Sequence, residues 1–201
     1  GIDTKEKKLK LDNGEDLPYE KVVLATGASS FLPPIENLRT ANNVIGLRNL
    51  DDAIRIKEIA PKVKNIIILG AGLVGVDAMA GLLDYDAKVT MIEMGDRILP
   101  LQLDHYAADV YIERLKEEGV DFRFNVRAEK VIVDENNNPV AIKLNTGEEV
   151  PGELIIACTG VRSNVGFLEG SGIECDKFGL IFNPKGETNV KDVYGAGDIS
   201  G

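Results

Sequence analysis

Three glycines at fixed spacing are the residues whose types and positions most directly indicate chemistry. They lie in the hexapeptide GAGLVG, which follows the apolar run NIIIL. Gly70 allows a tight turn out of a strand, Gly72 lets the backbone approach a pyrophosphate, and Gly75 lets a helix pack closely on a sheet. The free N–H groups of the first helical turn, at Leu73 and Val74, would face that anion. The pattern predicts a dinucleotide site, with a purely structural glycine turn as the alternative.

A carboxylate follows at the spacing expected for ribose recognition. A helix is predicted from Leu73 to about Asp84, and a second strand from Lys88 to Glu93. Glu93 lies 23 residues after Gly70, close to the roughly 20 residues at which an acidic side chain binds a ribose 2′-OH. A carboxylate there repels a 2′-phosphate and favours NAD(H) over NADP(H), whereas Arg97 could accommodate that phosphate.

The composition is that of a soluble protein with a packed core. The 201 residues are 44% hydrophobic and 28% charged, which is ordinary for one or two globular domains. The net charge of −10 argues against a nucleic-acid or anionic-membrane surface. No apolar run reaches the roughly 20 residues of a membrane helix, and no signal peptide opens the sequence. We therefore expect a cytoplasmic protein with no nucleic-acid and no membrane partner.

The other reactive residue types form no recognisable catalytic or metal site. Cys158 and Cys175 are 17 positions apart and fit neither a CxxC pair nor a zinc pattern, so buried structural thiols are the favoured interpretation. The single histidine, His105, has no evident partner, and no tyrosine is followed by a lysine four positions later. The histidine-based constellations of hydrolases are therefore missing, and we assign no catalytic residue and no metal ligand.

An internal repeat accounts for the late position of the glycine motif. Residues 9–30 match residues 142–163 without gaps at a separation of 133 positions, with 9 of 22 positions identical. Each copy predicts a strand, a tight turn around a glycine, and a buried strand that ends at Thr26-Gly27 or Thr159-Gly160. Duplication is the favoured explanation, and convergence of similar strands is the alternative.

Duplication would also explain how the sequence starts. The spacing aligns Gly1 with Asp134, so the segment equivalent to residues 65–133 would precede Gly1, and the first residue is not Met. We therefore expect a fragment that is cut inside a hairpin of an earlier dinucleotide-binding unit.

The elements that must position these motifs alternate in type, as in an α/β protein. A complete βαβ unit is predicted over residues 65–93. The other expected elements are helices at 49–59 and 103–118, a strand at 121–124, a β-meander at 130–150 with its turn at 136–139, and a buried strand at 154–158. The predicted fold is a Rossmann-like domain with a parallel sheet plus a β-meander.

Several motifs together resemble the pyridine nucleotide-disulfide oxidoreductase family over essentially all 201 residues. They are the two Thr-Gly strand exits, the central glycine motif, Arg97-Ile98-Leu99-Pro100, and Thr188 followed by Tyr194-Gly195-Ala196-Gly197-Asp198. The branch that the sequence resembles contains NADH oxidases, the NADH-binding part of nitrite reductase, rubredoxin or ferredoxin reductases and coenzyme A-disulfide reductases. Taken alone, the segment that ends at Asp198 could be an ordinary strand exit.

The resemblance implies an FAD-binding domain interrupted by an inserted NAD(P)H-binding domain, with hydride passing from nicotinamide C4 to flavin N5. The residues implied at the NAD site are Gly70, Gly72, Leu73, Val74, Gly75, Asp77, Glu93, Arg97, Thr159 and Gly160. Those implied beside FAD are Thr26, Gly27, Gly197 and Asp198, the last of which would bind the ribityl chain. Asp77 departs from the family, which usually has Glu at this position near the nicotinamide and flavin.

Three domain segments follow from the resemblance. Residues 1–35 would be the C-terminal remnant of the first half of the FAD-binding domain, 36–160 the NAD(H)-binding domain, and 161–201 a partial return segment of the FAD-binding domain. The expected fold class is thus an α/β NAD-binding domain flanked by partial pieces of a second domain.

The expected function is that of the NAD(H)-binding portion of an FAD-dependent NADH oxidoreductase. The fragment itself should bind NAD(H) without turnover, because the first flavin fingerprint, the redox-active cysteine region and the interface domain of the family are absent. The electron acceptor stays open among oxygen, a disulfide, rubredoxin or ferredoxin, and a nitrite-reducing partner, and a homodimeric parent is allowed. The alternative is a non-catalytic NAD-binding or interaction module without flavin.

Overall fold

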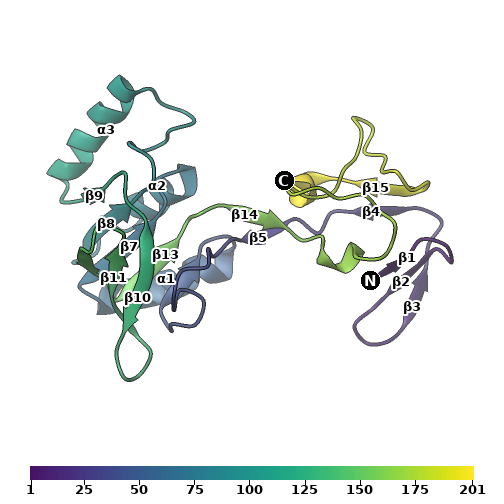
Figure 1. Cartoon of the computed structure of the whole chain (residues 1–201), viewed down its shortest axis with the longest axis horizontal. Coiled ribbons are helices and arrows are strands. Elements are labelled where there is room, and N and C mark those ends of the chain that lie inside the picture. Colours follow the sequence, from purple (N-terminus) through teal and green to yellow (C-terminus); the bar gives the residue numbers. More distant parts are fainter. The chain divides into compact units, whose positions relative to one another are not determined.

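The computed structural model describes all 201 residues, which form two compact units. The first combines Gly1–Ser29 with Val161–Gly201, and the second is the continuous segment Ser30–Gly160. The chain therefore leaves the first unit once, builds the second, and returns (Figure 1). None of the helices is long and apolar enough to cross a membrane.

A five-stranded parallel sheet forms the centre of the second unit. Its strand order is β6-β13-β7-β8-β9. The strands are β6 (Val44–Gly46), β13 (Leu154–Ala157), β7 (Asn65–Leu69), β8 (Lys88–Ile92) and β9 (Asp121–Arg123). The central strand β7 has four consecutive buried residues, as expected for a parallel strand that is covered on both faces. The predicted α/β class and parallel sheet are confirmed by these pairings.

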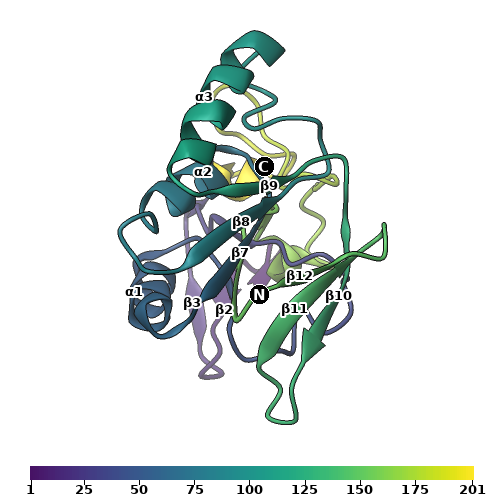
Figure 2. The ribbon, with the colours of Figure 1, turned by 90° about the vertical axis from the view of Figure 1, so that its left-hand side faces the viewer.

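Helices cover one face of this sheet. They are α1 (Leu50–Ile59), with the short 3₁₀ turn η1 (Ala60–Lys62) after it, α2 (Leu73–Ala80) and α3 (His105–Glu117). Ile66 and Ile68 of β7 point to this face, where they pack in one cluster with Met79 of α2 and Ile112 of α3. Figure 2 shows the three helices around β7 and β8.

The β-meander covers the opposite face. Its strands are β10 (Ala128–Val133), β11 (Pro139–Leu144) and β12 (Glu149–Pro151), paired antiparallel in that order. Ile67 and Leu69 of β7 point to this side and pack in one cluster with Val131 and Ile142 of the meander. Because side chains alternate along a strand, β7 contributes to two separate cores and is fixed in register by both.

Helix α2 is shorter than the sequence pattern predicts and lacks a side-chain cap. We expected it to continue to about Asp84, but it ends at Ala80 with Gly81 as its C-cap, since glycine favours helix termination. In α1, Asn49 and Asp52 form a capping box, and in α3 Asp104 accepts a hydrogen bond from Ala107 N. No side chain caps the N-terminus of α2.

The first unit is built from short strands. Its elements are β1 (Ile2–Asp3), β2 (Lys8–Lys10), β3 (Asp16–Pro18), β4 (Val22–Leu24), β5 (Ala28–Ser30), β14 (Val161–Ser163), η2 (Gly166–Leu168), β15 (Val193–Gly195) and η3 (Gly197–Ser200). Strands β1 to β3 form an antiparallel sheet, β4 pairs in parallel with β15, and β5 pairs with β14. A core that includes Leu24, Leu180 and Ile199 holds this unit together.

The sequence repeat corresponds to a repeat of backbone structure. The pairing of Leu9 with Leu17 recurs 133 positions later as Ile142 with Val150. The turn glycines have nearly the same backbone angle, with φ of +86° at position 14 and +88° at position 147. The pairings of the two hairpins match residue for residue in this region.

Upstream of this region the two copies differ by four residues. Ile2 pairs with Leu9 in the first copy, and Val131 pairs with Ile142 in the second. Ile2 is thus equivalent to Val131, and the predicted alignment of Gly1 with Asp134 is wrong. The reason is the loop between Asp3 and Lys8, which is four residues shorter than its counterpart between Ile132 and Ala141.

Candidate functional site

A crevice opens at the carboxyl end of β7, where the strand order reverses direction. The chain continues from β7 to β8 on one side, whereas β13 lies on the other side. In open α/β sheets this switch point is where ligands bind. A cavity of about 470 Å³ lies here. It is lined by Pro33, Pro34, Ile35, Leu69, Gly70, Gly72, Ile92, Glu93, Met94, Val126, Arg127, Ala128, Cys158 and Thr159.

The three glycines of the motif differ in the space around their Cα atoms, and this space shows where a dinucleotide could fit. Gly70 has a φ of +99°, and a Cβ on it would lie 2.5 Å from the carbonyl oxygen of Cys158. A Cβ on Gly75 would collide with the carbonyl oxygen of Gly70. A Cβ on Gly72, by contrast, would meet no atom within 4 Å. The first and third glycines are therefore required by packing, and the second leaves open space beside the backbone.

The N-terminus of α2 adds an electrostatic component to this open space. Gly72 is the N-cap residue, and the first turn contains Leu73, Val74 and Gly75 with no acidic side chain. Leu73 and Val74 are exposed. Uncapped N–H groups and the positive end of the helix dipole favour an anion at this position. The local structure therefore fits the pyrophosphate of a dinucleotide.

Glu93 follows β8 and its carboxylate is held by backbone groups on two loops. Its Oε2 atom accepts a hydrogen bond from Ala71 N at 2.8 Å, and its Oε1 atom accepts one from Gly95 N at 2.7 Å. The side chain thus connects the glycine-rich loop to the loop after β8. Each carboxylate oxygen can accept a second hydrogen bond, so two hydroxyl groups of a ribose could still bind to it.

Arg97 has partners that place it outside the cavity lining. Its Nε atom donates to the carbonyl of Leu103 at 3.1 Å, and its Nη2 atom donates to the carbonyl of Pro100 at 3.2 Å. Its Nη1 atom forms an ion pair with Asp96 at 2.8 Å, and the side chain is only 21% exposed. Arg97 therefore stabilises the loop that leads into α3.

Asp77 is on α2 but faces a different region. It is exposed and lines a separate groove between α1 and α2, together with Lys57, Gly81 and Tyr85 among others. It is not among the residues that line the crevice at the end of β7. Within the second unit, the structure brings Gly70, Gly72 and Glu93 together and separates Asp77 from them.

The exit of β13 forms the opposite wall of the crevice. Thr159 lines it and donates from Oγ1 to the carbonyl of Phe31 at 2.5 Å. Gly160, which has a φ of +97°, accepts a hydrogen bond from Phe31 N at 2.9 Å. These two bonds hold the start of the segment that continues to Pro33 and Pro34. Gly160 thus helps to hold the crevice wall through its backbone carbonyl.

Several crevice residues were missed by sequence reasoning. Pro33, Pro34 and Ile35 fall in the segment 1–35 that was predicted to belong to the FAD-binding domain, yet they line the crevice and lie in the second unit. Met94 and the segment Val126–Ala128 also line it. The position of Met94 directly after Glu93 was a usable signal. The prolines gave none, because their contact with the crevice depends on the pairing of distant strands.

Cys158 lies in the wall of the crevice as an unreactive thiol. Burial raises the pKa of its thiol to about 12, so it remains protonated at neutral pH and is a poor nucleophile. The backbone of Cys158 passes close to Gly70. A Cβ added to Gly75 would lie 3.6 Å from the Cβ of Cys158. Its role here is to shape the wall.

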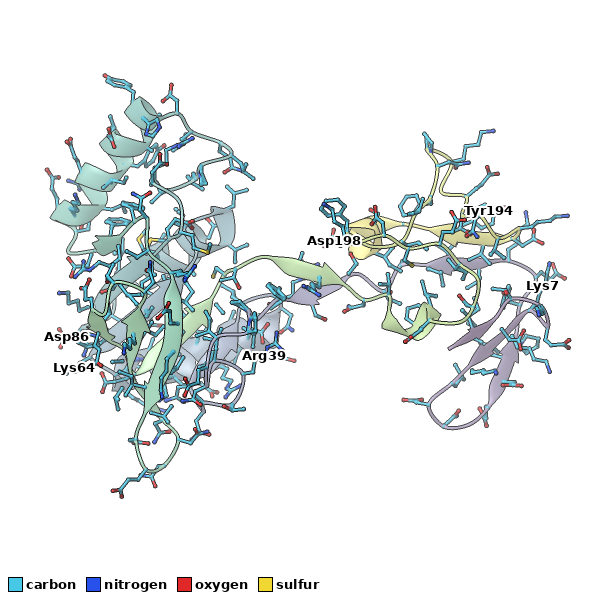
Figure 3. The ribbon with its side chains drawn as sticks, viewed as in Figure 1. Lys7, Arg39, Lys64, Asp86, Tyr194 and Asp198 are labelled. Atoms are coloured by element: carbon cyan, nitrogen blue, oxygen red, sulfur yellow. The ribbon has the colours of Figure 1, made fainter.

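In the first unit, the candidate FAD residues lie at the exits of two paired strands. Thr26 and Gly27 follow β4, and Gly197 and Asp198 follow β15. Because β4 and β15 run parallel, these exits lie at the same edge. Thr26 Oγ1 donates to the carbonyl of Asn164 at 2.9 Å. Asp198, labelled in Figure 3, is exposed near the end of the chain.

Several curated proteins are similar in sequence to nearly the whole of this chain. An NADH-dependent phenylglyoxylate dehydrogenase subunit epsilon from Aromatoleum evansii is 31% identical over 186 residues, covering 92% of this chain and 43% of the relative. Other relatives are named after different electron acceptors, among them rubredoxin and ferredoxin. The chain spans about half the length of the curated relatives that it matches.

Solved structures share the fold over nearly the whole chain. An NAD-dependent persulfide reductase from A. fulgidus is 28% identical with a TM-score of 0.90, covering 98% of this chain and 37% of that one. An FAD-dependent pyridine nucleotide-disulphide oxidoreductase from Desulfovibrio vulgaris is 23% identical, with a TM-score of 0.84. The match covers 98% of this chain and 51% of the Desulfovibrio chain.

The family match extends over every residue of the sequence. It covers residues 1–201 and is to the family described as pyridine nucleotide-disulphide oxidoreductase. The matched residues therefore include all the motifs that suggested this family: the glycine motif, the acid at the end of β8 and the Thr-Gly exits. The chain belongs to the pyridine nucleotide-disulphide oxidoreductase family, whose members are NAD(P)H-dependent and FAD-dependent oxidoreductases.

Proposed function

We propose that this chain is the NAD(H)-binding part of an FAD-dependent NADH oxidoreductase. The observation that carries the proposal is the crevice at the end of β7, where Gly72 leaves open space beside the uncapped α2 N-terminus. The carboxylate of Glu93 lines the same crevice, beside the glycine-rich loop, where it accepts a hydrogen bond from Ala71 N at 2.8 Å. Together they match the pyrophosphate and the adenosine ribose of one dinucleotide.

The roles of the residues follow from their positions. The N–H groups of Leu73 and Val74 would bind the pyrophosphate, and Glu93 would accept hydrogen bonds from the ribose hydroxyls. Gly70, Gly75 and Gly160 would act by maintaining the backbone path, and Thr159 by fixing the wall. Bound NADH would supply a hydride, and a flavin would accept it. This division of labour leaves the protein to bind, orient and exclude water.

The flavin would be held by the first unit. Thr26 and Gly27 at the exit of β4, and Gly197 and Asp198 at the exit of β15, are the residues we assign to it. We assign the first unit, residues 1–29 and 161–201, to an FAD-binding domain, and residues 30–160, which include the crevice residues Pro33–Ile35, to the NAD(H)-binding domain. The final electron acceptor is left open, since relatives are named after several.

Flavin reduction tests this proposal against the alternative of a non-catalytic NAD-binding module. The longest natural protein that contains this sequence would be purified and mixed anaerobically with NADH. We expect a yellow protein whose absorbance near roughly 450 nm, the usual flavin band, is bleached by NADH. A colourless protein that still binds NADH would overturn the oxidoreductase and favour the binding module.

A further inference from the structure

The lining of the crevice contains one acidic and one basic residue. Glu93 and Arg127 are the only charged residues in its lining, and the remaining residues are apolar or neutral. The segment that carries Arg127 is tied to the exit of β8, because Val126 N donates to the carbonyl of Glu93 at 3.3 Å. Asn125 N also donates to the carbonyl of Gly95 at 2.9 Å.

The backbone of Arg127 is fixed, while its guanidinium is weakly held. Its N–H donates to Asn145 Oδ1 at 2.9 Å, and its carbonyl accepts from Asn145 N at 2.9 Å. The guanidinium contacts Glu129 at 3.5 Å, and the side chain is 64% exposed. An exposed ion pair of this length contributes little, so the guanidinium can turn toward a bound anion at small cost.

Arg97 is in the opposite situation. Its guanidinium binds two backbone carbonyls and the carboxylate of Asp96, and it does not line the crevice. Arg123, which also lies beside the end of β8, pairs with Glu148 and does not line the crevice. Arg127 is therefore the arginine positioned to meet a nucleotide.

We propose that Arg127 is a specificity-determining residue that reads the 2′ position of the adenosine ribose, in opposition to Glu93. This inference rests on the proposed function of the crevice. The carboxylate of Glu93 accepts hydrogen bonds from a 2′-hydroxyl and repels a 2′-phosphate. The guanidinium of Arg127 attracts that phosphate through charge-assisted hydrogen bonds. NADH is preferred because Glu93 is held in place by two backbone N–H groups, whereas the exposed Arg127 guanidinium has only a 3.5 Å ion pair with Glu129.

Because Glu93 and Arg127 act in opposite directions on a 2′-phosphate, removing the charge of Glu93 should change the nucleotide preference. In Glu93→Gln the repulsion disappears, and the amide oxygen can still accept a hydrogen bond from a backbone N–H. Arg127 then remains as the charged residue in the lining, so ligands with a 2′-phosphate should gain affinity. The gain should depend on Arg127, because Arg97 keeps its existing partners.

The probes that isolate this effect are 5′-AMP and adenosine 2′,5′-bisphosphate, which differ only by the 2′-phosphate. Both would be titrated calorimetrically into the 201-residue chain and its Arg127→Gln, Glu93→Gln and doubly substituted variants. We expect the wild-type chain to prefer 5′-AMP, and Glu93→Gln to shift the affinity ratio by about tenfold toward the bisphosphate. The double variant should lose that shift. Arg127→Gln alone should weaken the bisphosphate more than 5′-AMP.

Lys143→Gln is the matched control, because Lys143 is exposed on the same meander and does not line the crevice. It removes the same charge and should leave the affinity ratio unchanged. If it reproduced the effect of Arg127→Gln, overall charge would explain the result and the inference would fail. The inference would fail equally if the double variant kept the shift, or if Glu93→Gln produced none.

The outcomes separate this inference from the function on which it rests. If the wild-type chain binds NADH and 5′-AMP but no variant changes the ratio, the crevice is a nucleotide site and only the role of Arg127 is wrong. If the wild-type chain binds neither NADH nor 5′-AMP, the proposed function and the inference about Arg127 are both wrong. Should Glu93→Gln not fold, Arg127→Gln in the wild-type background still decides, because an equal effect on both probes would overturn the inference.

Discussion

Glu93 combines two roles at one side chain, since the carboxylate that would bind ribose also connects two loops. Replacing it by alanine removes the acceptors of Ala71 N and Gly95 N. We expect Glu93→Ala to lower stability by about 1–3 kcal/mol, the usual cost of leaving such groups unpaired, and to weaken NADH binding. Denaturation and NADH titration measure the two effects. Full stability in the alanine variant would mean that the two hydrogen bonds are unimportant.

The two cysteines should differ sharply in reactivity. Burial raises the pKa of Cys158 to about 12. Cys175 is exposed, so the prediction of a buried thiol is wrong at this position, and its pKa is raised by partial burial and by Asp176. At pH 8 the thiolate fraction of Cys158 is roughly a thousandth of that of a thiol with a pKa of 9. We expect iodoacetamide to modify Cys175 first and Cys158 only after unfolding. Mass spectrometry of timed samples would show the order, and early labelling of Cys158 would contradict the buried position.

The same pKa gives a dependence of stability on alkaline pH. The unfolded chain loses the Cys158 proton near its ordinary pKa, while the folded chain retains it until about pH 12. The unfolded state therefore binds fewer protons in this interval, and stability falls as the pH rises from about 9. The free energy of unfolding of Cys158→Ala should decline less over that range than that of the wild-type chain.

At the level of single residues, the sequence predicted which side chain stands at the end of β8 but not what holds it. The spacing from Gly70 to Glu93 was sufficient for the first. The hydrogen bonds from Ala71 and Gly95 depend on how two loops meet across the edge of the sheet, which spacing does not encode. Arg97 shows the same limit, because its partners Pro100 and Leu103 belong to a loop whose path is set by tertiary packing.

At the level of elements, the loop between β7 and α2 allows a direct comparison of two glycines. A Cβ on Gly72 has no neighbour within 4 Å, while a Cβ on Gly75 collides with the carbonyl of Gly70. We expect Gly75→Ala to lower the free energy of unfolding by about 1–3 kcal/mol. In Gly72→Ala the poorer N-cap preference of alanine and the reduced entropy of the unfolded chain oppose each other, so the free energy of unfolding should change by less than about 1 kcal/mol. The same substitution should weaken NADH binding by about tenfold or more.

Urea denaturation and calorimetric titration of both variants would check this contrast. If Gly72→Ala bound NADH as well as the wild-type chain, the open space beside Gly72 would not be the pyrophosphate position. If Gly75→Ala were as stable as the wild-type chain, the close approach of α2 to β7 would not depend on that glycine.

The elements predicted best were those with the clearest periodicity. The apolar runs of β7, β8 and β13 predicted buried parallel strands, and Asn49 marked the start of α1 correctly. The end of α2 was missed, because Leu82 and Leu83 continue a helix-compatible apolar pattern beyond Gly81, where the helix ends. The place of Pro33–Ile35 in the crevice wall could not be predicted, because it depends on the three-dimensional pairing of distant strands.

At the scale of the whole molecule, the two units rest on different kinds of contact. The second has two apolar cores on opposite faces of one sheet. The first has one core and is supplemented by an ion pair between Lys7 and Asp192 at 2.6 Å. Lys7 is labelled in Figure 3, in the loop between β1 and β2. This pair connects that loop to the turn that leads into β15.

Acid pH should weaken the first unit through this pair. The hydrogen bond and charge of Lys7 hold the pKa of Asp192 below its usual value, so the stabilisation is present above about pH 4 and is lost as the pH falls through the lowered pKa. Asp192→Asn should lower the Tm at pH 7 and reduce its further fall at pH 3. Asp16→Asn is the control, because Asp16 pairs with Lys8 only at 3.8 Å on the exposed surface. A larger effect at Asp16 would contradict the assignment.

The central claim is that the crevice at the end of β7 binds NAD(H) in preference to NADP(H). Calorimetric titration of the 201-residue chain with NADH and with NADPH tests it most directly. We expect saturable binding of one NADH per chain, weaker binding of NADPH, and loss of NADH affinity in Gly72→Ala. Tighter binding of NADPH, or no saturable binding of NADH, would contradict it.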